Sequence, residues 1–111
     1  MNELNEFGLS EEAMKWILRV IGVFPEIEEV IIFGSRAKGT YKPGSDIDFA
    51  IKGNLPDFSY PEKLRSMLEE GLYLPYFFDV LDYSKIKNPE VKDHIDCVGK
   101  IFYTKNETVI R

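Results

Sequence analysis

The chain has 111 residues, of which 44% are hydrophobic and 30% are charged, and its formal net charge is −5. This length predicts one domain that spans residues 1–111. The 14 basic residues do not form a cluster of the kind that neutralises a nucleic-acid backbone, so long DNA or RNA is not an expected substrate. A single nucleotide remains compatible with this charge.

The sequence also predicts a cytoplasmic protein. No apolar run approaches the roughly 20 residues that a membrane-spanning helix needs. The acidic segment 1–6 lacks the basic flank and apolar core of a signal peptide. Cys97 is the only cysteine, so no disulfide can form within the chain.

The first half of the chain alternates helical and strand patterns. Ser10 is expected to cap a helix that Pro25 ends. The apolar stripe of this helix is expected to consist of Met14, Ile17, Leu18 and Ile21, with Ala13, Val20 and Phe24 adjoining it. A strand apolar on both faces is predicted at 29–33, a short helix from Ser35 to Gly39, and a second strand at 46–51.

The second half continues the alternation. Pro61 is expected to begin a helix whose buried stripe is Leu64, Met67, Leu68 and Leu72. A third strand is predicted at 76–81, a turn capped by Ser84, a helix at 89–98 and a fourth strand at 100–103. This order predicts an α/β fold with a mixed sheet of about four strands, flanked by helices.

Three carboxylates are the strongest candidates for a metal site. Asp46 and Asp48 are two residues apart on a predicted strand, so both project from one face, while Ile47, Phe49 and Ile51 project from the other. Asp79 interrupts an otherwise hydrophobic strand, where an ionised side chain needs compensation. Asp82 is the rival third carboxylate, but three residues along the strand it points to the opposite face.

The chemistry of these carboxylates favours two hard divalent cations. Three carboxylates within about 4 Å of each other repel by about 4 kcal/mol per pair, so they need cations, protons or water nearby. Oxygen ligands without histidine or cysteine favour Mg²⁺, or Mn²⁺, over zinc. Two such ions can clamp the attacking and leaving oxygens of a phosphoryl-type displacement.

The segment before these carboxylates predicts a phosphate site. Gly34 lets a ligand approach the backbone closely, and Ser35 begins a short helix whose free N–H groups attract phosphate. Arg36 and Lys38 lie two residues apart, so only one of them is expected to reach the phosphates. Lys42 is a weaker candidate, and a capping role alone is the alternative for Ser35.

The combined pattern resembles the minimal nucleotidyltransferases of the DNA polymerase β superfamily. The residues that carry the resemblance are Gly34-Ser35-Arg36, Ser45-Asp46-Ile47-Asp48 and Asp79 within the strand Phe78-Asp79-Val80-Leu81. It covers most of the chain from Val30 to Tyr103. Lys38 stands where many members have arginine.

The resemblance implies a specific reaction. Gly34 and Ser35 would bind the triphosphate, Asp46 and Asp48 would hold both Mg²⁺ ions, and Asp79 would complete one metal site and assist deprotonation of the acceptor. The chain would transfer a nucleoside monophosphate, most often AMP from ATP, to an acceptor hydroxyl. Many small members act as antitoxins of HEPN proteins and adenylylate a tyrosine on that partner, so a homo- or hetero-oligomer is possible.

A second function belongs to a different class. The chain could be an interaction subunit that neutralises its partner by occlusion and keeps only a vestigial nucleotide site. Retention of all three aspartates together with Gly34 and Ser35 favours the enzyme, because a binding module has no use for costly clustered charge.

Several other residues are interpreted as structural. His94, the only histidine, is expected at a solvated helix position, and Cys97 is expected to pack on an apolar face. Trp16 and the tyrosines are assigned mainly to packing. The segment from Tyr73 to Tyr76 is a candidate partner-binding patch if it is partly exposed.

Overall fold

A computed structural model describes residues 4–70 and 76–105. Its strands are β1 (Ile27–Phe33), β2 (Ile47–Gly53), β3 (Phe78–Asp82) and β4 (Lys100–Thr104). Its helices are α1 (Glu11–Gly22), α2 (Ser35–Lys38), α3 (Tyr60–Glu70) and α4 (Pro89–Val98), with a 3₁₀ turn, η1 (Tyr83–Lys85). None of the helices in these two ranges has the length and apolarity to cross a bilayer.

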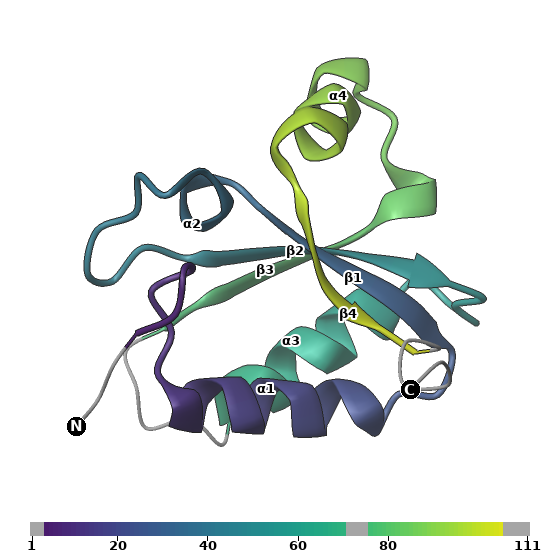
Figure 1. The fold of residues 1–111 in the computed structure, drawn as a ribbon. Coiled ribbons are helices and arrows are strands. Elements are labelled where there is room, and N and C mark those ends of the chain that lie inside the picture. Colours follow the sequence, from purple (N-terminus) through teal and green to yellow (C-terminus); the bar gives the residue numbers. More distant parts are fainter. Residues whose placement is uncertain (1–3, 71–75, 106–111) are drawn as a thin grey trace.

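The four strands form one mixed sheet in the order β3-β2-β1-β4, which confirms the predicted α/β fold. β1 pairs antiparallel with both β2 and β4, and β2 pairs parallel with β3. The parallel pair needs a crossover connection, and α3 supplies it. Figure 1 shows α1 and α3 against one face of the sheet and α4 against the other.

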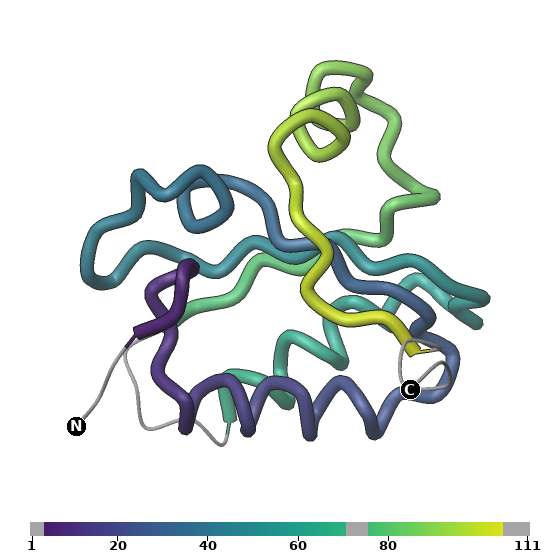
Figure 2. The backbone as a smooth tube through the Cα atoms, in the orientation of Figure 1, coloured from purple at the N-terminus to yellow at the C-terminus, as the bar shows by residue number. Residues whose placement is uncertain are grey.

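The central position of β1 explains why this strand is apolar on both sides. Val30 and Ile32 belong to the larger core cluster, which includes the buried residues of α1 and α3. Ile31 and Phe33 face the other side and pack in a smaller cluster with Ile95 of α4. The backbone trace in Figure 2 follows β1 through the middle of the molecule between these two layers.

The N-terminal helix begins where the sequence predicts it, but its buried stripe is rotated. Ser10 caps α1 by accepting a hydrogen bond from the amide of Ala13. The buried residues are Ala13, Ile17, Val20 and Ile21. Leu18 is 38% exposed, so its assignment to the buried stripe is wrong. It lies one residue past Ile17, about 100° around the helix from the inward direction.

Other expected boundaries shift slightly. α3 starts at Tyr60, and Met67 is 37% exposed while Leu64 and Leu68 are buried; Leu72 lies outside the described residues. β3 begins at Phe78 rather than at the predicted position 76, and the Phe77 side chain before it is exposed. Asp82, not Ser84, caps the turn η1, because its carboxylate accepts from the Ser84 amide.

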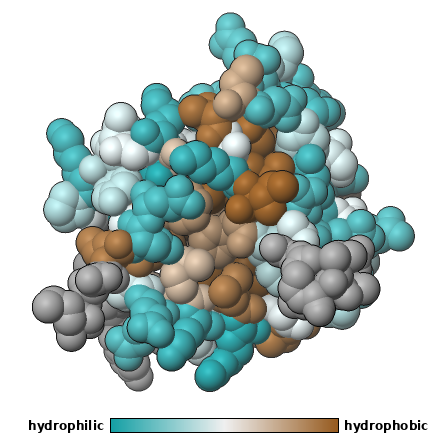
Figure 3. All heavy atoms as spheres, in the orientation of Figure 1, coloured by the Kyte–Doolittle hydropathy of each residue, from teal (hydrophilic) through white to brown (hydrophobic). Residues whose placement is uncertain are grey.

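The surface of the molecule on the β4 side is partly apolar. Figure 3 shows apolar side chains gathered between α4 and α1 on this side of the molecule. Ile101 of β4 is 62% exposed. The apolar surface lies on the far side of β1 from the strands that carry the three aspartates.

Candidate active site

Asp48 lies at the centre of the candidate active site, on β2. Its backbone pairs with Phe33 of β1 on one side and with Asp79 of β3 on the other. Paired residues on adjacent strands project from the same face of a sheet. Asp46 lies two residues before Asp48, just ahead of the strand, and thus on that same side. The sheet therefore brings together the three aspartates that the sequence singles out.

The opposite face at this position is closed. Ile47, Phe49 and Ile51 have no exposed surface and belong to the core with α1 and α3. The carboxylate face is more open, since Asp46 and Asp79 are exposed and Asp48 is half-buried. The predicted alternation along β2 is confirmed.

The electrostatics of Asp48 reflect its neighbours. Partial burial, followed by the charges of Asp79 and Asp46, raises the pKa of Asp48 to about 6, although the positive charge of Arg36 acts in the opposite direction. A cation bound beside Asp48 would offset the repulsion that Asp79 and Asp46 exert on its carboxylate.

The donor chemistry fits hard divalent cations, but the side chains do not form a finished cage. Among residues 4–70 and 76–105, no three acidic, histidine or cysteine side chains converge closely enough to bind a metal ion together. The backbone register pairs Asp48 with Asp79 on the neighbouring strand, and the Asp79 side chain is exposed.

The position of Gly34 requires a glycine because the Asp48 carboxylate lies next to it. It follows Phe33, the cross-strand partner of Asp48, and its φ angle is +75°. A Cβ atom at Gly34 would collide with the Asp48 carboxylate. Glycine is therefore the residue that allows the turn into α2 and the side chain of Asp48 to occupy the same place.

α2 has the expected length but orients its two cations differently. Gly39, with φ of +81°, ends the helix after Lys38. Lys38 is exposed at this end. Arg36 is 2% exposed and donates hydrogen bonds to the carbonyl oxygens of Phe7, Gly8 and Ser45. Only one of the two cations was expected to reach the phosphates. Arg36 directs its donors into the protein, and Lys38 is the cation of the pair that remains exposed.

Asp79, rather than Asp82, is the carboxylate next to Asp48. Asp82 pairs with Ile51 at the far end of β3, and its carboxylate caps η1. The start of β3 is held in two ways. The Phe77 carbonyl accepts from the Ile47 amide at 2.9 Å, and the Glu69 carboxylate accepts from the Phe78 amide at 2.8 Å.

The charged neighbours of His94 predict a solvated helix position, but its surroundings in the structure are different. It is half-buried, and its ring meets the Phe33 ring edge-on, with centroids 6.1 Å apart. Phe33 pairs with Asp48, so this histidine lies on the carboxylate side of the sheet rather than in open solvent. The sequence offered no signal for this, because the helical stretch around it is charged throughout.

Cys97 is exposed, and its predicted packing is wrong. It follows the inward-facing Ile95 by two residues, which turns it about 200° away from that direction. Its Sγ lies 3.8 Å from an Asp93 oxygen. Trp16 packs against the core and donates to the Leu68 carbonyl, as a structural role requires. Of the candidate partner patch, 73–75 lie outside the described residues, and Tyr76 is half-buried against Arg36.

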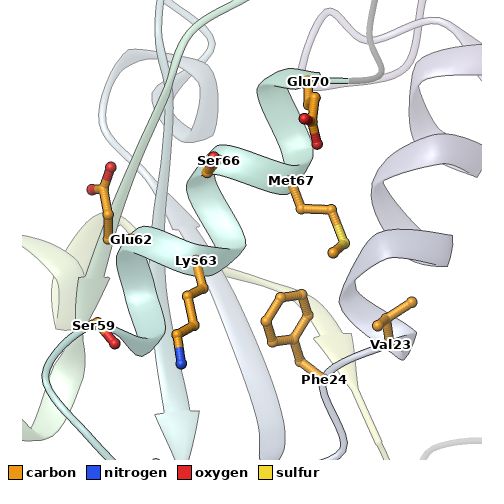
Figure 4. A pocket seen from close by; sticks show the side chains of 8 residues that line it. All are labelled: Val23, Phe24, Ser59, Glu62, Lys63, Ser66, Met67 and Glu70. Atoms are coloured by element: carbon orange, nitrogen blue, oxygen red, sulfur yellow. The ribbon is translucent and has the colours of Figure 1, made fainter.

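A shallow hollow of about 560 Å³ lies elsewhere, between the end of α1 and α3. Figure 4 shows Val23, Phe24 and Met67 on its apolar side, with Lys63 and Glu62 projecting from α3. α1 and α3 cover the face opposite the carboxylates. This hollow is therefore separate from the candidate active site.

The mixed four-stranded sheet thus carries Asp48 and Asp79 on adjacent strands, directly behind the turn at Gly34. The sequence from 16 to 108 matches the family described as polymerase beta, nucleotidyltransferase. The chain belongs to this family, which confirms the resemblance seen in the sequence. No curated protein matches the chain at a significant level.

Solved structures with the same fold include toxin–antitoxin complexes. A toxin–antitoxin crystal structure with AMP-PNP is 21% identical, with a TM-score of 0.68 over 86% of this chain and 76% of the other. A complex of the tri-AMPylated Shewanella oneidensis HEPN toxin with its MNT antitoxin is 17% identical, with a TM-score of 0.63 over 90% and 76%. A putative nucleotidyltransferase from Sulfolobus solfataricus is 27% identical, with a TM-score of 0.55 over 86% and 79%.

Proposed function

We propose that this chain transfers a nucleoside monophosphate, AMP from ATP, to a hydroxyl group on a partner protein. The observation that carries the proposal is the position of Asp48. It lies between Asp46 and Asp79 on the open side of the sheet, directly behind the turn at Gly34. A purely structural site would not concentrate three carboxylates at one end of a sheet, because their repulsion is destabilising.

Asp46, Asp48 and Asp79 would hold two Mg²⁺ ions, with Mn²⁺ as an alternative. Carboxylate oxygens are the ligands that these hard cations prefer. When bound, the ions would neutralise charge on the triphosphate and stabilise the attacking and leaving oxygens. The chain's own contribution is to hold Asp48 half-buried, where fewer waters compete with a ligand.

The nucleotide's phosphates would rest against the turn formed by Gly34 and Ser35. Gly34 lacks a side chain that would block the backbone, and Ser35 offers a hydroxyl and an N–H group at the first turn of α2. Lys38, exposed on α2, would meet phosphate charge from the far end of that helix. Arg36 has no part in these contacts because its donors face the interior.

The transfer itself is a displacement at the α-phosphorus. The acceptor oxygen forms a bond to this phosphorus, and the bond from phosphorus to the bridging oxygen of the β-phosphate breaks. Pyrophosphate leaves with that electron pair. The carboxylate of Asp79 would take the hydroxyl proton; its exposure on the open side of the sheet supports this role.

The acceptor is proposed to be a tyrosine hydroxyl on a HEPN-type partner. Support comes from one structural relative, the MNT antitoxin in complex with a HEPN toxin that is tri-AMPylated. The net charge of −5 agrees with a protein acceptor rather than a long nucleic acid.

The experiment uses ATP labelled at either the α- or the γ-phosphate, with Mg²⁺ and a cognate HEPN-type protein. Nucleotidyl transfer moves the α-label onto the partner and leaves the γ-label in pyrophosphate, whereas kinase activity would move the γ-label onto the partner and leave the α-label in ADP. Asp46→Asn should abolish incorporation, and Asp93→Asn, an exposed carboxylate on α4, should not. Neutralisation of the partner that persists in Asp46→Asn would support occlusion instead.

A further inference from the structure

Arg36 is the one buried charged side chain among residues 4–70 and 76–105, and it forms no ion pair there. Instead its guanidinium donates to carbonyl oxygens on two distant segments. Nε and Nη2 both donate to Ser45, at 3.1 and 2.9 Å. Nη1 donates to Phe7 at 2.8 Å and to Gly8 at 3.3 Å. The forked group thus joins the N-terminal segment to the loop before β2.

Two tyrosine rings enclose the same guanidinium. Its central carbon lies 5.2 Å from the ring centre of Tyr41 and 5.0 Å from that of Tyr76. The Tyr76 hydroxyl donates to the Gly8 carbonyl at 3.4 Å, so it shares an acceptor with Arg36. A cation over aromatic faces is stabilised further when water is excluded, as it is here.

The segments that Arg36 contacts are those that carry the candidate site. Ser45 directly precedes Asp46, and Tyr76 comes three residues before Asp79. Arg36 itself comes two residues after Gly34. The backbone carbonyl of Ser45 receives two hydrogen bonds, which fixes the peptide that leads into Asp46.

We infer that Arg36 is a positioning residue that holds the three site segments in register, and that the turn at Phe7 and Gly8 belongs to the active-site scaffold. This inference rests on the proposed function, because it concerns the same carboxylates. Arg36 touches no substrate; it acts by fixing the backbone that carries Asp46 and by restraining the start of β3 through Tyr76.

Lysine at position 36 cannot make the contacts that Arg36 makes. Lysine has one ammonium group instead of a planar fork of N–H donors. It therefore cannot donate twice to the Ser45 carbonyl and also reach the carbonyls of Phe7 and Gly8. Gly8 is equally constrained, because its φ angle is +76° and a Cβ would lie 2.5 Å from the Tyr41 ring and 2.9 Å from Arg36 Nη1. Gly8→Ala therefore disturbs the guanidinium from a position 28 residues away, without altering Arg36 itself.

The test compares Arg36→Lys and Gly8→Ala with two controls in the full chain. Arg19→Lys changes an exposed arginine on α1 in the same way, and Ile27→Val weakens the core at the other end of β1. Mn²⁺ binding is titrated in the presence of AMP-PNP, below the melting temperature of every variant. Backbone amide shifts of the metal-free chain are recorded by NMR.

Arg36→Lys and Gly8→Ala should each weaken Mn²⁺ binding by about 10- to 100-fold, as loss of a supporting contact typically does. The amide resonances of Asp46 and Asp79 should shift in both variants, while those in the middle of α1 stay in place. Both controls should bind Mn²⁺ like the wild type. A transfer assay should show the same pattern, with the catalytic rate falling more than the apparent affinity for ATP.

Wild-type affinity in both Arg36→Lys and Gly8→Ala would overturn the inference while leaving the proposed function standing. Equal loss in Ile27→Val would also overturn it, since general destabilisation would then explain the effect. Failure of the wild-type chain to bind Mn²⁺ with AMP-PNP would instead contradict the proposed function, and this inference with it.

Discussion

The two faces of β2 differ sharply at adjacent positions. Phe49 has no exposed surface and packs its ring 4.9 Å from that of Phe102 and 5.9 Å from that of Phe78, measured between centroids. Asp48, the preceding residue, faces the other way beside Asp79. α1 and α3 cover the Phe49 face, whereas α4 packs on the other face around Ile95.

This difference separates two physical tasks within one strand. The face under α1 and α3 contributes burial of apolar surface, which is the main source of folding free energy. The carboxylate face opposes folding through repulsion and partial burial of charge. Stability and ligand binding can therefore be changed independently by substitutions one residue apart.

The largest stability effect is expected on the apolar face. Phe49→Ala should lower the free energy of unfolding by about 3–5 kcal/mol, because it removes a fully buried ring and leaves a cavity. The side chains of Asp46, Asp48 and Asp79 are untouched, so Mn²⁺ binding by the folded fraction should persist. Urea denaturation measures the first effect and titration at low temperature the second. Loss of metal binding in the folded fraction would show that the two faces are coupled.

Gly34→Ala is expected to affect both tasks at once. The new methyl group would collide with the Asp48 carboxylate, and the backbone there has φ of +75°. We expect destabilisation of about 1–3 kcal/mol, the usual cost of such a conformation in a non-glycine residue, together with loss of nucleotide transfer. Gly39→Ala, also at positive φ but with open space around it, is the control and should retain transfer. Equal activity of the two variants would contradict the proposed crowding.

Asp48→Asn should raise the free energy of unfolding, which Phe49→Ala lowers. The pKa of Asp48 in the folded chain is about 6, against 3.8 for an unperturbed aspartate, so its contribution to stability is present below about pH 4 and lost as the pH rises through about 6. At pH 7 the metal-free variant should be more stable by about 1–2 kcal/mol, after allowance for solvent screening of this half-exposed group.

The measurement for Asp48→Asn is urea denaturation of both chains at several values of pH. The difference in unfolding free energy should grow between about pH 4 and pH 6 and then level off. The variant should also lose any rise in melting temperature on addition of Mg²⁺ with ATP. A retained metal response would be strong evidence against the carboxylate site.

The smallest effect is expected far from both faces. Ser10→Ala removes the hydrogen bond from the Ala13 amide and should cost about 1 kcal/mol of stability, the usual value for a lost N-cap. Mn²⁺ binding and transfer should not change. Thermal denaturation checks the first expectation. Reduced metal binding would show that the N-terminal segment transmits strain from α1 to Arg36.

The sequence predicted the elements and the faces of the strands well, because both follow from local periodicity. The alternation that puts Asp48 opposite Ile47 and Phe49 is a property of any extended strand. The helix at Pro89–Val98 was predicted with its observed bounds. In the structure Asn88 caps it and Pro89 lies in its first turn. The buried stripe of α1 was predicted wrongly at Leu18, because two apolar stripes adjoin and packing selected between them.

What the sequence determined by itself is the set of candidate site residues: Gly34, Ser35, Asp46, Asp48 and a third carboxylate on a later strand. Their types and spacing are chemical requirements that remain readable without coordinates. The sequence also favoured Asp79 over Asp82, but only the tertiary structure supplied the pairing that puts Asp79 beside Asp48, since strand register depends on long-range pairing. The tertiary structure also turned Arg36 inward, because two carbonyl-bearing loops and two tyrosine rings from distant parts of the chain meet there.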